Sequence, residues 1–175
     1  MGEALPLFGV SLFFLLAIGG VVAVVVTMNG QTRKHQTAIW QAFAQRYGGM
    51  FRAGSGAFGG HEIRFALAHT HVVVRTTMVS VMEAIGSPYF SDGGTYTLVS
   101  GAHPHRGGPT LKVQGPMART LPGAVGEAGA HLPPGAVVVS SATEATVVFP
   151  GAVMNEHMLW AGLSVVAALT ANPRG

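Results

Sequence analysis

The chain has 175 residues, of which 49% are hydrophobic and only 10% are charged, and its formal net charge is +3. An intrinsically disordered chain shows the opposite balance, so the composition excludes that class. A surface that binds nucleic acid needs clustered Lys and Arg, and the longest basic run here is Arg33-Lys34-His35, so nucleic acid is not an expected partner. The length allows one domain of ordinary size with one additional element.

The residue types that are missing or rare narrow the chemistry further. The chain has no cysteine, which excludes disulfides, thiolate nucleophiles, iron–sulfur clusters and zinc sites built from cysteine. Arginine outnumbers lysine by eight to two, a bias that GC-rich bacterial genomes tend to produce. We therefore expect a bacterial protein whose function does not depend on thiol chemistry.

An apolar segment near the start is the clearest feature of the sequence. No Asp, Glu, Lys or Arg lies between Glu3 and Arg33, and residues 5–28 are predominantly apolar. As a helix with a rise of about 1.5 Å per residue, residues 5–28 span roughly 36 Å, which exceeds the bilayer's hydrocarbon core of about 30 Å. The sequence predicts a single-pass transmembrane helix over 5–28, preceded by a short tail over residues 1–4.

A cleaved signal peptide is the alternative interpretation of the same segment. Signal peptides begin with a basic region and have an apolar region of about 7–15 residues. Here Glu3 is the only charged side chain before the apolar run, and the apolar run over residues 5–28 is longer than the apolar region of a signal peptide. Ala17-Ile18-Gly19 has the small residues of a cleavage site, so the alternative stays open.

The charges that flank the segment predict its orientation. Arg33 and Lys34 follow the apolar run, and the positive-inside rule places such a flank in the cytoplasm. We therefore expect a bacterial inner-membrane protein whose C-terminal domain is cytoplasmic. Residues 29–36 are polar and are expected to form a hinge next to the membrane.

The remaining chain predicts one α+β domain over residues 37–172, followed by a tail over 173–175. Apolar residues at helical spacing favour a helix that Thr37 caps and Gly48 ends, and residues 61–67 alternate like a strand. Further strands are expected over 71–82, 95–99, 110–114, 136–141 and 144–149. The last two of these strands are expected to form a hairpin. A weak helix is expected over 116–127, with a break at Pro122. This order favours a mostly antiparallel sheet, covered on one face, with two or three packed helices.

The last expected helix begins at Asn155, a good N-cap residue, and ends near Thr170. Residues 158–171 carry no charge, but the run is shorter than a bilayer span. We predict a helix buried in the domain core. Re-entry of this helix into the membrane is the alternative.

Histidine is the unusual polar residue, with eight copies, four of which form two pairs of the form His-x-His. On a strand, residues i and i+2 point to the same face, so His69 with His71 and His103 with His105 are candidate ligands for zinc or copper. Such a site needs three or four ligands, and His61 is a possible addition, as is His131. The alternative is that both pairs are solvated histidines in loops.

Motifs for catalysis do not fit their required context. The run Gly54 to Gly59 matches the spacing of a dinucleotide-binding loop, yet it leads into an alternating strand rather than a helix. The sequence has no G-x-S-x-G and no H-E-x-x-H. An enzyme is therefore not the favoured interpretation, although a site built from distant residues would leave no motif.

The sequence favours a membrane-anchored, non-catalytic interaction or scaffold protein of a bacterial envelope. Its expected partners are the lipid bilayer and either another protein or a second copy of the chain, and no cofactor is expected. The alternative function is a membrane-tethered domain that binds zinc or copper through the His-x-His pairs.

Overall fold

The computed structural model describes residues 31–55, 60–77, 94–104 and 107–171. The chain divides into two units, Met1–His35 and Gln36–Gly175. The transmembrane helix expected over residues 5–28 lies outside the described residues, together with the two terminal tails. No helix among the described residues is long and apolar enough to cross a bilayer.

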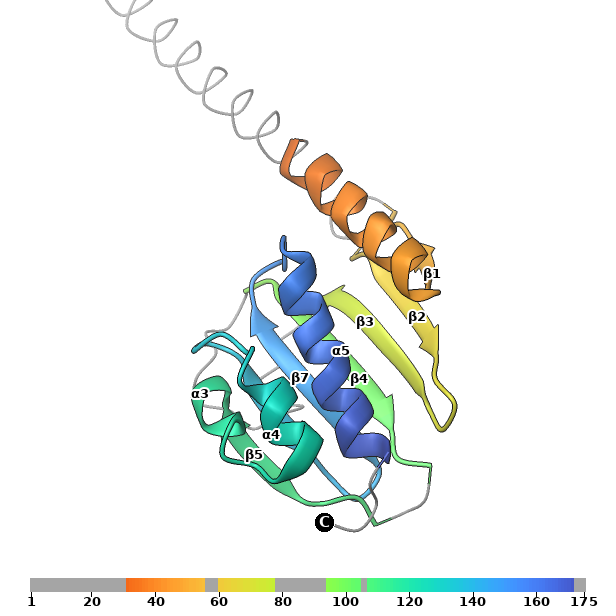
Figure 1. Ribbon diagram of the computed structural model, residues 1–175. Helices are drawn as coiled ribbons and strands as arrows, with labels where there is room; N and C mark the ends of the chain where they lie inside the picture. Colours follow the sequence, from red (N-terminus) through yellow and green to blue (C-terminus); the bar gives the residue numbers. More distant parts are fainter. Residues whose placement is uncertain (1–30, 56–59, 78–93, 105–106, 172–175) are drawn as a thin grey trace, which may run out of the picture. The chain divides into compact units, whose positions relative to one another are not determined.

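Seven strands of the second unit form a single sheet in the order β1-β2-β3-β4-β7-β6-β5, and every neighbouring pair is antiparallel (Figure 1). The strands are β1 (Met50–Arg52), β2 (Glu62–Ala66), β3 (His71–Thr77), β4 (Tyr96–Ala102), β5 (Leu111–Gln114), β6 (Val137–Ser140) and β7 (Glu144–Pro150). The expected α+β class and its antiparallel sheet are therefore confirmed. β1 and β5 are the two edges of this sheet.

Alternation of apolar and polar residues decides which face of each strand is buried. In β2, Ile63 and Phe65 are buried while Arg64 between them is exposed. The same two-residue period buries Val72 and Val74 in β3. Since side chains alternate between the faces of a sheet, this pattern confirms the alternation predicted for the strand within residues 61–67.

The hairpin of β6 and β7 was also expected, and its turn contains the polar groups that such a turn needs. The Ser141 amide donates to the carbonyl of Glu144, at 2.8 Å. The Ser141 hydroxyl accepts from the amides of Thr143 and Glu144, at 3.3 and 3.2 Å. These bonds occupy backbone groups that the tight turn would leave unpaired.

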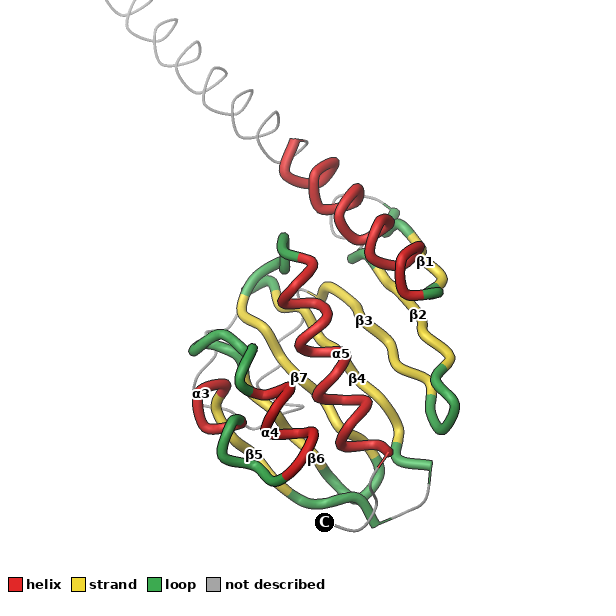
Figure 2. Tube along the Cα trace, in the orientation of Figure 1, coloured by secondary structure: helices red, strands yellow, loops and turns green. Residues whose placement is uncertain are grey.

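Helix α5 (Glu156–Ala171) lies over the strands beside α4 (Gly123–Gly129), as Figures 1 and 2 show. The side chain of Asn155 accepts a hydrogen bond from the His157 amide at 2.8 Å, which confirms the predicted N-cap. Helix α3 (Gly115–Ala118) precedes α4, and the two are separated at Pro122 as the sequence predicted. α5 is thus a helix buried against the sheet, as expected.

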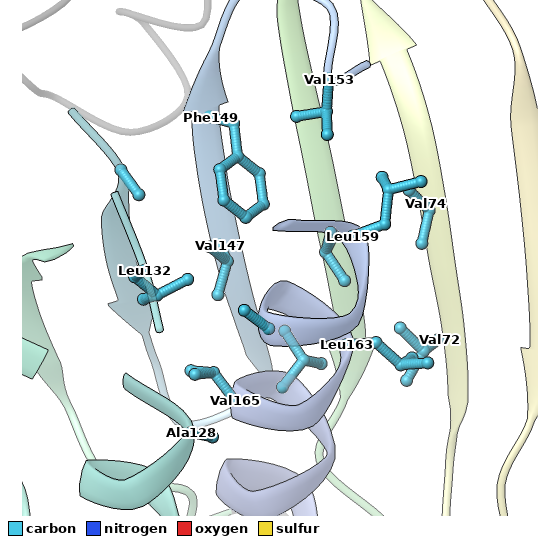
Figure 3. Packing of buried hydrophobic residues seen from close by; sticks show 14 of the residues in the cluster. Val72, Val74, Ala128, Leu132, Val147, Phe149, Val153, Leu159, Leu163 and Val165 are labelled. Atoms are coloured by element: carbon cyan, nitrogen blue, oxygen red, sulfur yellow. The ribbon is translucent and has the colours of Figure 1, made fainter. Parts of the chain in front are cut away.

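Small residues let α5 approach the sheet closely. A Cβ atom at Gly162 would lie 2.8 Å from a ring carbon of Phe149, and a Cβ at Gly101 in β4 would lie 2.8 Å from Val166. Figure 3 shows Leu159 and Leu163 of α5 directed at the strands, among Val147, Phe149 and Val74. Each large apolar side chain buried in this layer contributes about 1.5–3 kcal/mol, so the packing of α5 against the sheet stabilises the core.

The first described helix covers residues 31–47, which corrects one expectation. Thr37 lies inside the helix and not at its start, while a hinge over residues 29–36 stays a prediction. The helix ends where expected: Gly48 has φ of +71°, and the Gly49 amide donates to the carbonyl of Ala44 at 2.7 Å. This is the bond of a Schellman cap, which favours glycine because the backbone enters the left-handed region.

Trp40 fixes this helix to the domain. Its ring is fully buried, and its indole N–H donates to the carbonyl of Val153 at 2.9 Å. Phe43 is equally buried and meets Phe65 of β2 edge-on, with ring centroids 5.7 Å apart. Trp40 and Phe43 therefore lie on the core face of the domain's first helix.

The sheet face turned away from α5 also carries buried apolar residues, which corrects the expectation that one face alone is covered. Tyr96 and Leu98 of β4 alternate with residues that contact α5, and they form a second cluster with Val137 and Val148. All four side chains are buried. Near-continuous valine in β6 and β7 is consistent with strands that are buried on both faces.

Candidate functional site

His103 and Ser140 form the pair of described residues that most resembles catalytic machinery. His103 directly follows β4, Ser140 ends β6, and the His103 Nε2 lies 3.1 Å from the Ser140 Oγ. A histidine within hydrogen-bonding distance of a serine hydroxyl is the arrangement that activates serine nucleophiles. The His103 amide donates to the carbonyl of Thr143 at 2.8 Å, which fixes the backbone beside the pair.

The surroundings of this pair do not suit nucleophilic catalysis. His103 is 8% exposed and Ser140 is 2% exposed, so a substrate carbonyl cannot reach the hydroxyl without rearrangement. In a catalytic triad a carboxylate accepts from Nδ1, whereas the buried His103 Nδ1 has no hydrogen-bond partner among the described residues. Gly108 packs against the ring so closely that a Cβ atom there would lie 2.2 Å from Nε2. The pair therefore acts as a buried structural contact.

Burial also sets the charge of this histidine. Desolvation lowers the pKa of His103 below its ordinary value of 6.5, because the low-dielectric interior disfavours the imidazolium form. The ring is consequently neutral at pH 7. A neutral ring carries a hydrogen on one nitrogen only, so Nδ1 is left either as an unpaired donor or as an unpaired acceptor.

His69 contacts the C-terminal part of α5. It lies in the turn between β2 and β3, and its Nε2 is 3.3 Å from the carbonyl oxygen of Ala167 and 3.3 Å from the hydroxyl of Thr170. The Ala167 carbonyl also accepts from the Thr170 hydroxyl at 3.1 Å, so the His69 ring contacts two groups that already bond to each other in α5. His69 therefore joins the turn to the helix.

The other two histidines of the predicted metal site have different surroundings. His71 is the first residue of β3 and is exposed, and His105 lies outside the described residues. No three His, Asp or Glu side chains in the described parts of the chain come together in a way that would hold a metal ion. Metal binding by His69, His71, His103 and His105 thus stays a prediction.

His61 is the most extensively bonded histidine in the described structure. It is 4% exposed, its Nδ1 accepts from the Gly54 amide at 3.2 Å, and its Nε2 lies 3.0 Å from the Thr37 hydroxyl. Because Nδ1 accepts, the proton of the neutral ring is on Nε2, which donates to Thr37. A ring that donates to the hydroxyl cannot also take its proton, so this contact is structural.

Aromatic rings enclose His61 as well. The ring centroid of Trp40 lies 5.9 Å away and that of Phe51 in β1 lies 5.6 Å away. The residue joins the first helix, the segment after β1 and the start of β2. The sequence carried a signal for this position, since His61 shares the inward parity of Ile63 and Phe65. Its role as an additional metal ligand stays a prediction.

A second group of rings lies on the surface at the start of α5. The ring centroids of His131 and His157 are 5.2 Å apart, and Trp160 lies 6.4 Å from His157 and 6.2 Å from His131. All three residues are exposed. No short motif signals this group, because His131 follows α4 and the other two residues belong to α5.

Comparisons with protein-family models, with curated proteins and with solved structures found no match.

Proposed function

We propose that the chain is a single-pass inner-membrane protein whose C-terminal α+β domain is a non-catalytic interaction module of a bacterial envelope. The observation that carries the proposal is the uncharged apolar segment over residues 5–28, which is long enough to span a bilayer. Arg33 and Lys34 follow it after four polar or small residues and favour a cytoplasmic domain. The helix over residues 31–47 then leads into the packed domain through Trp40.

The roles of the buried polar side chains support a non-catalytic domain. His61 and His103 bond to other parts of the fold, and Thr97 does the same by donating to the carbonyl of Gly151 at 3.0 Å and accepting from the Val153 amide at 3.0 Å. Catalytic groups combine a reactive atom with access for substrate. These side chains instead hold strands, loops and helices together.

The partner surface in this proposal is the edge of the sheet at β1, and the occupant is a second copy of the chain. β1 pairs with β2 on one side only among the described strands, and Met50 on it is 73% exposed. Tyr47, at the end of the first helix, is a second large exposed apolar side chain close by in the sequence. An open strand edge with apolar side chains pairs readily with another strand, and anchoring in one membrane raises the effective concentration of the copies.

Membrane attachment is tested by placing charge at the centre of the apolar segment. Leu15→Arg with Leu16→Arg should move the full-length protein from the carbonate-resistant membrane pellet to the supernatant, because each Arg at a helix centre costs about 2.5–3.5 kcal/mol. Leu15→Phe with Leu16→Phe is the matched control and should stay in the pellet. A wild-type chain extracted by carbonate would overturn the proposal.

Self-association is tested with two exposed methionines. Full-length copies labelled with donor and acceptor dyes are placed in vesicles, and energy transfer between them is measured. Met50→Glu should reduce the transfer, since it places a charge in each copy at the proposed contact. Met117→Glu is the matched control, because Met117 is 59% exposed and lies on α3. Equal transfer in both variants would refute the β1 contact.

A further inference from the structure

Three arginines lie together on the sheet face that is turned away from α5. Arg52 of β1, Arg64 of β2 and Arg75 of β3 each follow a residue that packs into the core on the opposite face. The register pairs Glu62 of β2 with Arg52 on one side and with Arg75 on the other. Directly paired residues on one face have Cβ atoms about 4.5–5.5 Å apart, so these two arginines flank the glutamate. We call the four residues the basic face.

The charge of the basic face is only partly compensated. The Arg64 Nε donates to a carboxylate oxygen of Glu62 at 2.6 Å. Within the described residues, neither Arg52 nor Arg75 has an ion pair, and all three arginines are exposed. Two guanidinium groups are therefore available to an anionic partner.

The residue type and its placement suit a carboxylate. The planar guanidinium of arginine can donate two parallel N–H bonds to one carboxylate, which the point charge of lysine cannot do. The bond between Arg64 and Glu62 shows that a carboxylate already lies on this face. The three arginines stand on hydrogen-bonded strands, so the spacing of their backbone positions is fixed before a partner arrives.

Two other classes of anionic partner fit the basic face less well. The first helix packs on the opposite face of the sheet, where Phe43 meets Phe65, so the chain leaves the domain toward residue 30 from that side. This placement does not favour the bilayer as the occupant. Single-stranded nucleic acid stacks on aromatic side chains, and the described residues of β1, β2 and β3 present no exposed Phe, Tyr or Trp. An acidic segment of a protein needs neither feature.

We propose that the basic face binds a carboxylate-rich segment of a partner protein. Incoming carboxylates bond to Arg52 and Arg75, and they compete with Glu62 for Arg64. Glu62 is thus an internal competitor that limits the affinity. This surface is a face of the sheet and not the open edge of β1, and it requires neither self-association nor a membrane anchor.

Fluorescence anisotropy of dye-labelled hexaglutamate, titrated with the full-length chain in nonionic detergent, tests the proposal. Arg52→Gln with Arg75→Gln should weaken binding about fivefold, because both uncompensated guanidinium groups are lost. Lys112→Gln with Arg119→Gln is the matched control, since it removes the same charge from two other exposed positions, and should weaken binding less than about twofold. No binding by the wild type, or equal weakening in the two double variants, would overturn the proposal.

Glu62→Gln supplies a test in the opposite direction, which a loss of folded protein cannot imitate. Removing the competing carboxylate should strengthen hexaglutamate binding about two- to fivefold. Glu127→Gln, from an exposed position on α4, is its control and should leave the affinity unchanged. Absence of a gain in Glu62→Gln would contradict the assignment of this face. Displacement of the peptide by micelles containing phosphatidylglycerol, or tighter binding of a hexathymidylate oligonucleotide, would assign the face to lipid or to nucleic acid and overturn the proposal.

Discussion

The two buried histidines, His61 and His103, differ in how their ring nitrogens are satisfied. Both nitrogens of His61 have partners, from the helix over residues 31–47 and from the segment after β1. His103 has one partner, Ser140, and its Nδ1 is unpaired among the described residues. An unpaired buried polar atom costs about 1–3 kcal/mol, so the same residue type stabilises one region and costs free energy in the other.

The strongest test of this difference is His61→Ala. The substitution removes two hydrogen bonds, leaves the Gly54 amide without its acceptor and opens a cavity between Trp40 and Phe51. We expect the free energy of unfolding to fall by about 3 kcal/mol. Urea unfolding of the full-length chain in detergent measures the change, and a loss below about 1 kcal/mol would show that His61 is not the link between these elements.

Thr37→Val isolates one of the two bonds of His61. Valine keeps the shape of threonine but cannot accept from Nε2, which leaves that buried N–H unpaired. The expected loss is about 1–2 kcal/mol, smaller than for His61→Ala. Thr120→Val is a control from an exposed position, where the hydroxyl bonds only the carbonyl of Met117, and should cost less in the same unfolding experiment.

Replacing both members of the second pair should cost least. The double substitution His103→Leu with Ser140→Ala removes the whole imidazole, with its unpaired Nδ1, and also the hydroxyl that bonds to Nε2. When both partners of a buried polar contact are replaced by apolar groups, the free energy of unfolding can stay nearly unchanged. We expect the free energy of unfolding, measured in the same urea experiment, to change by less than about 1 kcal/mol. A loss as large as that of His61→Ala would mean that the two regions do not differ as described.

The pH dependence of stability supplies the smallest effect. Since burial lowers the pKa of His103 in the folded state, the unfolded chain takes up a proton first as the pH falls below the unfolded value of about 6.5. The contribution of this residue is fully present above that value and is lost as the pH falls through the folded pKa. Wild type should therefore lose more stability between pH 7 and pH 5 than His103→Leu with Ser140→Ala. Parallel curves for the two proteins would contradict the lowered pKa.

Much of the fold follows from local patterns in the sequence. The alternation around Ile63 and Phe65 predicted β2, and the side chain of Asn155 marked the start of α5. Thr37 misled the prediction because threonine is common at helix starts, whereas here its hydroxyl bonds a histidine far along the chain. The burial of Tyr96 and Leu98 on the second sheet face was also missed, since it depends on how strands from separate parts of the chain pair.

The candidate site was harder to predict, because a histidine's role depends on contacts between distant residues. The spacing of His69 and His71 suggested a shared strand face, but His69 precedes the strand and contacts α5. His131 and His157 come together through the packing of α4 beside α5, which no short motif records. Patterns of two or four residues predict local elements, and they do not predict which loops meet.

Retention of the N-terminal segment in the mature protein is the most direct test of the proposed membrane anchor. The measurement is the intact mass of the protein recovered from carbonate-washed bacterial membranes. An uncleaved anchor predicts that the protein in the membrane pellet has a mass that includes residues 1–20. A soluble protein whose mass corresponds to a chain beginning near Gly20 would show that the segment is a cleaved signal peptide and would contradict the proposal.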